Sequence, residues 1–382
     1  MRFLHTSDWH LGKTLKGRSR AGEHEAALAE IVDVIRKEKI DCVLVTGDLF
    51  DSQAPPPEAE ILAFNFFSEL RGLEVPAIVI GGNHDHPKRL LAIRDVLRLL
   101  DIHVRPEPCH PTNGGVIEVV KNGETAKIGC LPFVPIGRVE DATKLMGAEG
   151  QRYQDYTDLI ARMFEWLSES FNRKTINFLL GHLYVEGGDT SRSEREIHVA
   201  KPYAVSTQRF PATAHYIALG HLHRPQELLS PSRTLYAGSI LQLDFGEQDQ
   251  QKRVVIVDAH PGKPATIEDC PLSAGRKLRD VTGTMAQLEA QADTFGEDFL
   301  RVTVKTDQRM PGIAEKIHEL LPNALEIHQE YPRTEEEIIE IAGCEPPELF
   351  RGFYQNRNGS APPDTLMKLF DRLYEEVLSA SN

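Results

Sequence analysis

Hydrophobic residues recur along the first part of the chain in two alternating patterns. Short apolar runs predict buried strands, and longer segments with an apolar residue at every third or fourth position predict amphipathic helices. In chain order we expect a strand at Phe3–His5, a helix at Gly22–Lys37, a strand at Cys42–Val45, a helix at Glu58–Leu70, a strand at Val75–Ile80 and a helix at Lys88–Leu100. This alternation predicts an α/β fold in which helices cover the faces of a sheet.

The pattern changes further along the chain. Residues 104–133 are rich in β-branched residues, proline and glycine and predict strands and turns, and more strands are expected at Phe178–Leu180, Tyr216–Leu219 and Arg253–Val257. Strand and helix patterns then restart after a stretch rich in proline and glycine. We therefore expect a first domain at 1–258, a linker at 259–275, a small α+β domain at 276–332 and a C-terminal helical segment at 333–382.

Two of the expected helices carry apolar residues whose role the sequence leaves open. The helix Glu58–Leu70 is apolar on more than one side, so the excess either fills a crowded core or marks a self-association surface. The last helix, Asp364–Ala380, has an apolar stripe that either packs on the body of the protein or docks a partner.

Composition narrows the class of protein. Hydrophobic residues make up 41% of the 382 positions, enough for a large core. No apolar run approaches the ~20 residues needed to cross a bilayer, and the chain starts without the apolar segment of a secretory signal. The five cysteines are scattered and form no C-x-x-C pair. We therefore expect a cytoplasmic protein with reduced thiols and no membrane association.

Five short motifs with metal-binding side chains lie at or just after the ends of predicted strands. They are Asp8-Trp9-His10, Gly47-Asp48-Leu49-Phe50-Asp51, Gly82-Asn83-His84-Asp85, Gly181-His182 and Gly220-His221-Leu222-His223. Open α/β sheets place their sites at the carboxyl ends of strands, so these motifs are expected to converge. A single histidine is more often structural than a ligand, whereas five such motifs in series are hard to obtain by chance.

The candidate metal ligands contain no thiolate. They are Asp8, His10, Asp48, Asn83, His182, His221 and His223. This mixture of imidazole, carboxylate and amide oxygen suits a hard or borderline metal and disfavours a structural zinc site. So many ligands exceed the capacity of one tetrahedral ion, and two ions that share a bridging carboxylate are expected. Ions ~3.5–4 Å apart can stabilise the attacking and leaving oxygens of a displacement at phosphorus.

His84 adjoins a candidate ligand, and adjacent residues rarely bind a metal through the same geometry. We expect it to act as a general acid toward the leaving oxygen or to steady the phosphate. In this scheme Asp85 orients the imidazole ring and raises its pKa.

Charge gives a further prediction about the substrate. The net charge of −14 argues against a protein that coats nucleic acid, although local fields decide docking. Basic residues nevertheless lie next to the first and third motifs. Those expected to contact DNA phosphates are Lys13, Lys16, Arg18, Arg20, Lys88 and Arg89. An ordinary solvated surface is the competing interpretation for them.

With these residues in hand, the chain resembles the calcineurin-like metallophosphoesterase superfamily and, within it, the double-strand-break-repair nucleases. The resemblance is carried by Arg2–Gly12, by the Gly47–Asp51, Gly82–Asp85 and Gly220–His223 motifs, and by Phe350–Tyr354, so it spans the chain. It implies a sandwich of mixed sheets flanked by helices, a small capping domain and a C-terminal segment. Archaeal and eukaryotic members often carry histidine where this chain has Asp51.

The resemblance also implies specific roles. Asp8, His10, Asp48 and His223 would hold a first metal, Asp48, Asn83, His182 and His221 a second, with Asp48 bridging and His84 as the catalytic histidine. The metals would be two divalent ions, Mn²⁺ with Mg²⁺ as the alternative. The implied activities are 3′→5′ exonuclease action on double-stranded DNA ends and endonuclease cutting of single strands and hairpins, in DNA repair, recombination and replication. The implied partners are a coiled-coil ATPase that binds the C-terminal segment and a second copy of the chain.

Three functions compete at this point. The leading one is a two-metal DNA nuclease, in which a hydroxide that bridges the metals attacks the phosphodiester and His84 is the general acid. A small-substrate metallophosphodiesterase would use the same ligands but has less need of a capping domain and terminal helices. A non-catalytic scaffold would commonly have lost metal ligands, whereas all seven candidates are present here.

Overall fold

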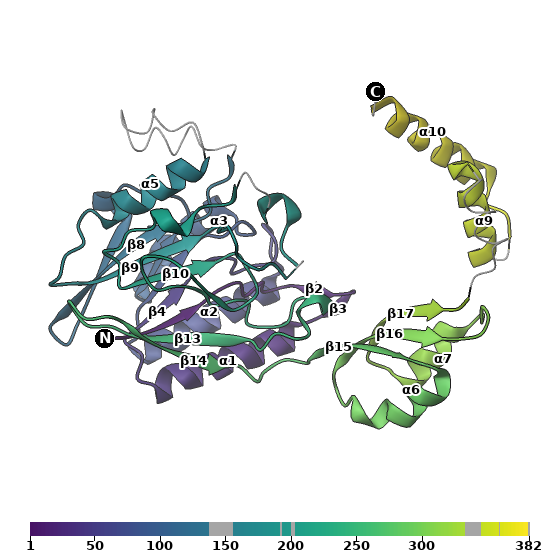
Figure 1. The fold of residues 1–382 in the computed structure, drawn as a ribbon, viewed down its shortest axis with the longest axis horizontal. Helices are drawn as coiled ribbons and strands as arrows, with labels where there is room; N and C mark the ends of the chain where they lie inside the picture. The colour runs from purple at the N-terminus through teal and green to yellow at the C-terminus, as the bar shows by residue number, and fades with distance from the viewer. Residues whose placement is uncertain (137–155, 192, 200–202, 333–344, 359, 381–382) are drawn as a thin grey trace.

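Two six-stranded sheets form the body of the protein (Figure 1). In the computed structural model of the chain, the residues described are 1–136, 156–191, 193–199, 203–332, 345–358 and 360–380. The first sheet has the order β14 (Thr266–Pro271), β13 (Arg253–Asp258), β1 (Arg2–Thr6), β4 (Cys42–Val45), β5 (Ala77–Ile80), β6 (Ile102–Arg105). The second has the order β11 (Gln226–Leu228), β12 (Thr234–Tyr236), β10 (Tyr216–Gly220), β9 (Ile176–His182), β8 (Glu124–Leu131), β7 (Val116–Lys121).

The sheets are joined by a buried hydrophobic layer, and helices cover their outer faces. The layer between them includes Phe3 of β1 and Phe178 of β9, whose ring centroids are 4.6 Å apart. The helices α1 (Ala21–Lys37), α2 (Pro57–Gly72) and α3 (Pro87–Leu99) pack on the first sheet, and α5 (Tyr156–Ser168) packs on the second. The predicted sandwich of mixed sheets flanked by helices is confirmed.

The strand pairing explains why the predicted motifs meet. Strands β1, β4, β5 and β6 are parallel neighbours, so their carboxyl ends share one edge of the first sheet. In the second sheet β9 and β10 are also parallel, with His182 opposite Gly220. The residues that follow these strands therefore collect at the same end of the sandwich.

The range expected as a linker, 259–275, is in part a strand. Residues Thr266–Pro271 form β14, which pairs antiparallel with β13 along its length. This is an edge strand whose side chains are mostly exposed or half-buried, so its sequence lacks the alternating apolar pattern that would predict it. The prediction of a linker was wrong for these residues.

The helix α2 settles one of the questions that the sequence left open. Phe66 and Phe67 are buried in the core, with the ring centroid of Phe66 4.9 Å from that of Trp9. Ile61, by contrast, is 56% exposed. Most of the apolar excess of this helix is therefore core, and a smaller part faces solvent.

A smaller unit lies beside the body (Figure 1). It consists of three parallel strands, β15 (Leu278–Gly283), β16 (Phe299–Lys305) and β17 (Ala324–Glu330), with the helices α6 (Met285–Gln291) and α7 (Ile313–Leu320). Leu278 and Phe299 of this unit pack against Phe245 of the body and against Leu15 of the hairpin β2 (Thr14–Leu15) and β3 (Arg18–Ser19). Short 3-10 turns occur at Pro111–Asn113, Glu196–Val199, Thr207–Arg209, Phe245–Glu247 and Ala292–Thr294.

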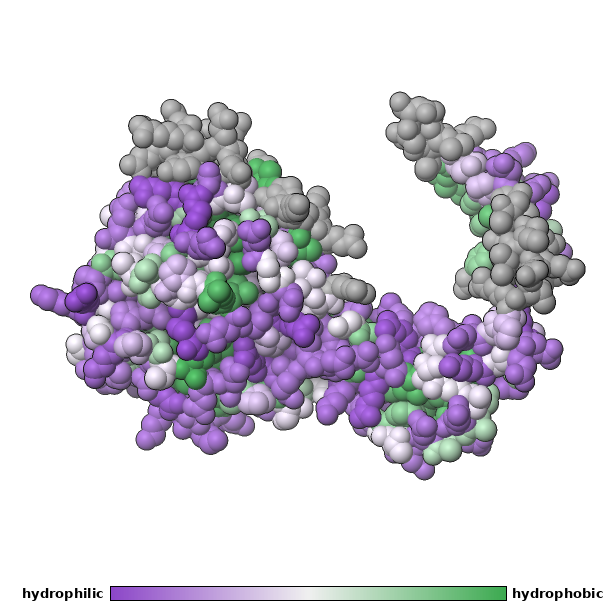
Figure 2. Space-filling view, in the orientation of Figure 1, coloured by the Kyte–Doolittle hydropathy of each residue, from purple (hydrophilic) through white to green (hydrophobic). Residues whose placement is uncertain are grey.

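Two helices end the described chain, α9 (Pro346–Asn358) and α10 (Asp364–Ala380). The rings of Phe350 and Phe370 stack with their centroids 4.3 Å apart and hold the two helices together. Phe353, Leu369 and Leu373 stay exposed, and hydrophobic residues are visible along this helical pair in Figure 2. Among the residues that the structure describes, no helix combines the length and apolar character needed to cross a membrane.

Candidate metal centre

The five motifs meet at one end of the sandwich, as their positions after the strands predict. Asp8, Asp48 and Asn83 follow β1, β4 and β5 of the first sheet, whereas His182 ends β9 and His221 follows β10 of the second. Every one of the seven candidate ligands is buried, and Asn83 is the least so, at 7% exposed. The site is therefore a junction between the two sheets.

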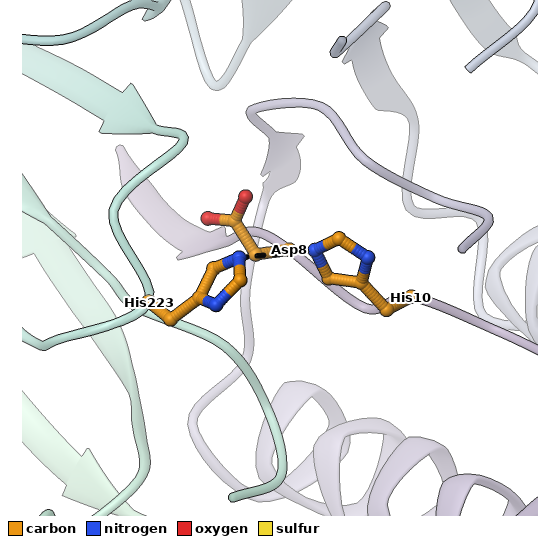
Figure 3. Close-up of side chains that lie close together, drawn as sticks. All are labelled: Asp8, His10 and His223. Atoms are coloured by element: carbon orange, nitrogen blue, oxygen red, sulfur yellow. Dashed lines mark hydrogen bonds between the residues drawn. The ribbon is translucent and has the colours of Figure 1, made fainter. Parts of the chain in front are cut away.

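Potential ligand atoms lie close together in three overlapping groups. Asp8, His10 and His223 form one group (Figure 3), Asp8, Asp48 and His182 form another, and His10, Asp48 and His84 form the third. Within each group the ligand atoms lie within 4.8 Å of one another. Asp8, His10 and Asp48 each belong to two of the groups, so two carboxylates lie where the groups overlap.

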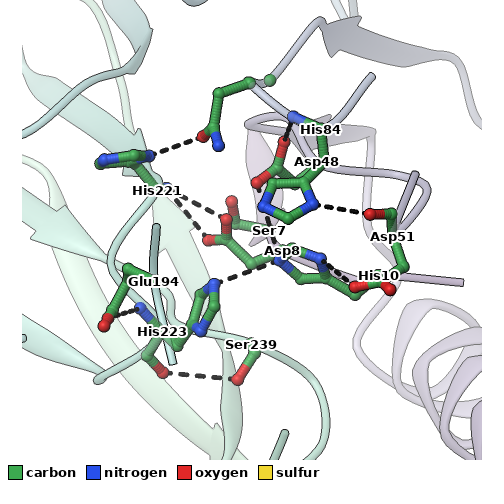
Figure 4. A network of polar contacts seen from close by, with 12 residues as sticks. Ser7, Asp8, His10, Asp48, Asp51, His84, Glu194, His221, His223 and Ser239 are labelled. Carbon is green, nitrogen blue, oxygen red and sulfur yellow. Dashed lines mark hydrogen bonds and ion pairs between the residues drawn. The ribbon is translucent and has the colours of Figure 1, made fainter. Parts of the chain in front are cut away.

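Asn83 connects the remaining histidine to these groups. Its Oδ1 atom is 2.9 Å from Nε2 of His182 and 2.8 Å from Nδ1 of His221. The structure thus brings all seven predicted ligands into one cluster. Figure 4 labels Asp8, His10, Asp48, His221 and His223 among them.

Several candidate ligands have an unusual backbone conformation. The φ angles of Asp8, His10, Asp48 and His221 are 51°, 49°, 51° and 104°. This left-handed region is disfavoured for residues with a side chain, and such strain is concentrated at functional sites. The neighbouring Gly47 has φ 98°, and a Cβ atom there would lie only 2.3 Å from Nδ1 of His182. Glycine is therefore required at this position for the histidine to reach the cluster.

Each of the four candidate histidines has one ring nitrogen held by a group outside the cluster. His10 Nδ1 lies 3.2 Å from Asp51 Oδ1, and His182 Nδ1 lies 2.7 Å from the carbonyl oxygen of Thr46. The other nitrogen of each ring then faces the cluster.

The same arrangement recurs in the second pair of rings. His221 Nε2 lies 3.3 Å from the carbonyl oxygen of His198, and His223 Nδ1 lies 2.6 Å from Ser193 Oγ and 3.3 Å from Glu247 Oε1. Metal-binding histidines commonly have their second nitrogen held in this way, because the outer hydrogen bond fixes the ring and its tautomer. The geometry of the four rings therefore fits bound divalent metal.

Electrostatics in the cluster link metal binding to the protonation of its histidines. Burial raises the pKa of Asp48, but the nearby His182 opposes this and leaves that pKa well below its usual value. Burial lowers the pKa of His10 to about 3, despite its hydrogen bond with Asp51. Burial lowers the pKa of His182, but the nearby Asp48 outweighs this and raises it to about 9, so metal binding at this ring must release a proton.

The structure places His84 next to the ligands but corrects the role expected of Asp85. The backbone N–H of His84 donates to Asp48 Oδ1 at 2.8 Å, and its Nδ1 atom lies 2.6 Å from the carbonyl oxygen of Asp51. The carboxylate of Asp85 instead accepts hydrogen bonds from the backbone N–H groups of Gly82, Leu49 and Phe50.

The expectation that Asp85 orients the His84 ring was therefore wrong. Its carboxylate fixes the two loops that carry Asp48 and Asn83. Burial lowers the pKa of His84, whereas the nearby Asp48 opposes that shift.

One of the predicted DNA contacts was also wrong. The side chain of Arg20 is fully buried and pairs with Glu23 at 2.7 Å, so it cannot reach a phosphate. Arg89 pairs with Glu60 at 2.7 Å, and Lys16 pairs with Glu326 of the smaller unit.

The other predicted contacts differ in their surroundings. Lys13 pairs with Asp51 at 3.1 Å, beside the cluster, whereas Arg18 and Lys88 are exposed. Contacts of these side chains with DNA stay predictions.

A cavity opens onto the cluster and contains residues that the sequence did not single out. Its volume is about 440 Å³, and its lining includes Asn83, Phe133, Arg195 and His198. The exposed Arg195 has its Nη2 atom 3.5 Å from Nδ1 of His84. The only sequence signal for it is its place in a polar stretch at 187–196. Ser193 and Glu194 lie in the same stretch and were not singled out, and no sequence signal pointed to Glu247.

Comparison with known proteins agrees with this geometry. The calcineurin-like phosphoesterase family matches residues 1–225, and a family described as the type 5 capsule protein repressor C-terminal domain matches residues 274–358. The SbcD component of nuclease SbcCD from Bacillus subtilis is 35% identical over 397 residues, which cover 99% of this chain and 98% of that protein. The component of the same name from Escherichia coli K12 is 29% identical, over 84% of this chain and 82% of that protein.

Among solved structures, a dimetal phosphatase from Danio rerio covers 71% of this chain and 96% of its own, with a TM-score of 0.44 and 10% identity. The sequence relatives match nearly the whole chain and the family match includes every ligand motif. The chain therefore belongs to the calcineurin-like phosphoesterase family, as a metal-dependent hydrolase of the SbcD nuclease type.

Proposed function

We propose that the chain is a two-metal DNA nuclease that works with an SbcC-type coiled-coil ATPase in DNA repair and recombination. The observation that carries this proposal is the buried cluster of seven ligands, in which every histidine has its outer nitrogen already held. Relatives that match 99% and 84% of the chain are named as components of a nuclease, which supports DNA as the substrate.

The ligands divide into two sets around Asp48. Asp8, His10, Asp48 and His223 would hold one ion, and Asp48, Asn83, His182 and His221 would hold the other. When bound, two divalent ions, Mn²⁺ in our proposal, would offset the charge of the phosphate and lower the pKa of a water molecule. Among the proposed ligands only Asp8 and Asp48 are carboxylates, so the ions would keep positive charge in reach of an anionic phosphodiester.

His84 is the residue that we assign to the leaving oxygen. Its Nδ1 atom is held by the carbonyl oxygen of Asp51, which leaves Nε2 for the substrate. Burial lowers the pKa of the ring in the free chain, and an anionic phosphate bound beside it would favour the protonated form. The protonated ring can then donate its proton to the oxygen that departs from phosphorus.

Arg195 is assigned to the phosphate of the substrate. Its guanidinium lies at the cavity, close to His84, and its fork of N–H groups matches the geometry of phosphate oxygens. In this position Arg195 would hold the scissile phosphate next to His84, whose ring protonates the leaving oxygen.

The finer activities and partners belong to the same proposal. We propose 3′→5′ exonuclease action on double-stranded ends, endonuclease action on single strands and hairpins, and a cytoplasmic location, where bacterial DNA lies. The exposed Phe353, Leu369 and Leu373 of the two terminal helices support docking on the coiled coil of the ATPase. The exposed Ile61 of α2 supports a homodimer formed through helices of the body.

The test is cleavage of linear duplex DNA labelled at its 3′ or its 5′ end, with Mn²⁺ and the partner ATPase present. We expect stepwise loss from the 3′ end that a chelator stops and that Asp48→Asn abolishes. A cyclic nucleotide and a bis-aryl phosphodiester are assayed in parallel. Rapid hydrolysis of the cyclic nucleotide with no loss of duplex DNA would favour a small-substrate metallophosphodiesterase and contradict the proposal.

A further inference from the structure

The outer partners of the four histidines are not alike. In the first ligand set, the partners of His10 and His223 include the carboxylates of Asp51 and Glu247. In the second set, the partners of His182 and His221 are the backbone carbonyl oxygens of Thr46 and His198. The two sets therefore differ in the charge of the groups that lie behind their imidazole rings.

Both carboxylates are held in a fixed orientation. Glu247 is fully buried, and Lys252 Nζ lies 2.7 Å from its Oε2 atom, so that Oε1 is left facing Ser193 and His223. The Ser193 hydroxyl donates to Glu247 and accepts from Nδ1 of His223.

Asp51 has a matching arrangement on the other side of the cluster. Lys13 Nζ lies 3.1 Å from the same Oδ1 atom that faces His10. The side chain of Asp51 is 28% exposed, so it lies at the edge of the site. The side chain of Glu247, by contrast, is fully buried.

A carboxylate behind a histidine makes the ring a stronger metal ligand than a carbonyl does. The negative charge draws the Nδ1 proton and increases electron density at the nitrogen that faces the ion. Removal of such outer partners typically weakens metal binding about 10–100-fold. The ligands themselves add to this difference, because the first set contains the carboxylate of Asp8 where the second set has the neutral amide of Asn83.

We propose that the two metal positions are unequal: the position formed by Asp8, His10, Asp48 and His223 binds its ion more tightly and fills first, and Asp51 and Glu247 are positioning residues that contribute to this through His10 and His223. The inference rests on the two-metal function proposed above. It gives Asp51 a role in this chain as the hydrogen-bond acceptor for His10, without direct contact with substrate.

Calorimetric titration of the metal-free, full-length chain with Mn²⁺ tests the proposal. We expect two binding steps of different affinity. Asn83→Ala, at a ligand of the second set alone, should remove the weaker step and leave the tighter one. Loss of the tighter step in Asn83→Ala would reverse our order and overturn the proposal.

Asp51→Asn is the main variant, since this side chain is partly exposed and its loss should not prevent folding. We expect the tighter step to weaken about 10–100-fold while the weaker step stays within about twofold. Glu60→Gln is the matched control, because Glu60 pairs with Arg89 on the body but lies outside the network. It should leave both steps unchanged.

Glu247→Gln provides the second variant, with its melting temperature measured because the change leaves Lys252 buried without a charged partner. The electron paramagnetic resonance spectrum at one equivalent of Mn²⁺ should show an isolated ion in the wild type and a mixture of loading states in both variants. Equal weakening of both steps, or no change in the tighter step of Asp51→Asn, would overturn the inference while the two-metal function stands. Fewer than two bound ions in the wild type would overturn the function itself.

Discussion

A Cβ atom on Gly82 would lie 2.1 Å from Oδ1 of Asp48 and 2.4 Å from its backbone nitrogen. The loop after β5 therefore passes so close to the loop after β4 that the carboxylate occupies the space of a side chain. Asp48 is shared between the two proposed ligand sets. The close approach of Gly82 therefore fixes the position of the carboxylate at the centre of the site.

The first prediction follows from this contact. Gly82→Ala should displace the Asp48 carboxylate and reduce nuclease activity more than about a hundredfold, with weaker binding of both Mn²⁺ ions in calorimetry. Gly72→Ala is the control, because no atom lies within 4 Å of the Cβ position of Gly72 at the end of α2. Equal activity of Gly82→Ala and wild type would contradict the packing argument.

Metal loading should stabilise the folded chain. Ligands that bind only the folded state raise its stability by about 2.7 kcal/mol at a hundred times the dissociation constant. We expect Mn²⁺ to raise the melting temperature of the wild type, chelator to reverse the rise, and Asp48→Asn to lose most of it. Calorimetric scans of both proteins with and without Mn²⁺ measure this, and an equal rise in the variant would argue against Asp48 as a ligand.

Replacement of His84 should separate catalysis from metal binding. His84→Gln removes the proton donor, and we expect kcat to fall about 10²–10⁴-fold, the usual contribution of general acid catalysis. Affinity for Mn²⁺ should stay within about threefold, because the proposed ligand sets do not include this ring. Loss of a metal-binding step in this variant would instead assign His84 to the third group of ligand atoms described above.

Arg195→Ala should act on substrate binding. A hydrogen bond to a charged group contributes about 1.5–3 kcal/mol, so kcat/KM for DNA should fall about 10–100-fold, chiefly through KM. The deficit should shrink as salt is added, since salt screens the contact that the wild type makes. An unchanged KM, measured by steady-state cleavage, would remove Arg195 from the phosphate contact.

His5 should make stability depend on pH. It lies between the sheets, with Nδ1 2.9 Å from the hydroxyl of Tyr216 and Nε2 3.0 Å from Oγ1 of Thr46, and burial lowers its pKa to about 3. The unfolded chain protonates this ring below about pH 6.5, but the folded chain does not. The stability that the neutral ring contributes is thus present above pH 6.5 and is lost as the pH falls toward 3.

The measurement is urea unfolding of the metal-free wild type and His5→Gln at several pH values. In that window the wild type should lose up to about 1 kcal/mol more per pH unit than the variant. The difference in unfolding free energy between the two proteins should therefore shrink as the pH falls. A constant difference from pH 7 to pH 4.5 would show that His5 does not titrate as described.

Much of the site was predictable because its ligands lie directly after apolar strands. A run such as Cys42–Val45 followed by Gly47 and Asp48 fixes both the strand and the end at which the carboxylate emerges. Parallel neighbouring strands end at the same edge of a sheet, so the residues that follow them lie close together.

The parts that could not be predicted depend on where a side chain points or on partners distant in sequence. Asp85 follows His84, but its carboxylate turns toward the backbone of Leu49 and Phe50. Glu247 lies behind His223 without any motif spacing to indicate it, and Arg20 resembles its exposed basic neighbours although it is buried. The edge strand β14 covers little of the core, so its side chains need no apolar alternation. Its sequence therefore lacks the pattern that would predict a strand.

The left-handed backbone at Asp8, His10, Asp48 and His221 has an evolutionary consequence. Each such residue costs the fold about 1–3 kcal/mol that glycine or asparagine would largely recover. A lineage that stopped using the site would gain stability by drifting to those residues, because nothing would oppose the change. Aspartate and histidine at these four positions therefore exchange stability of the fold for the chemistry of their side chains.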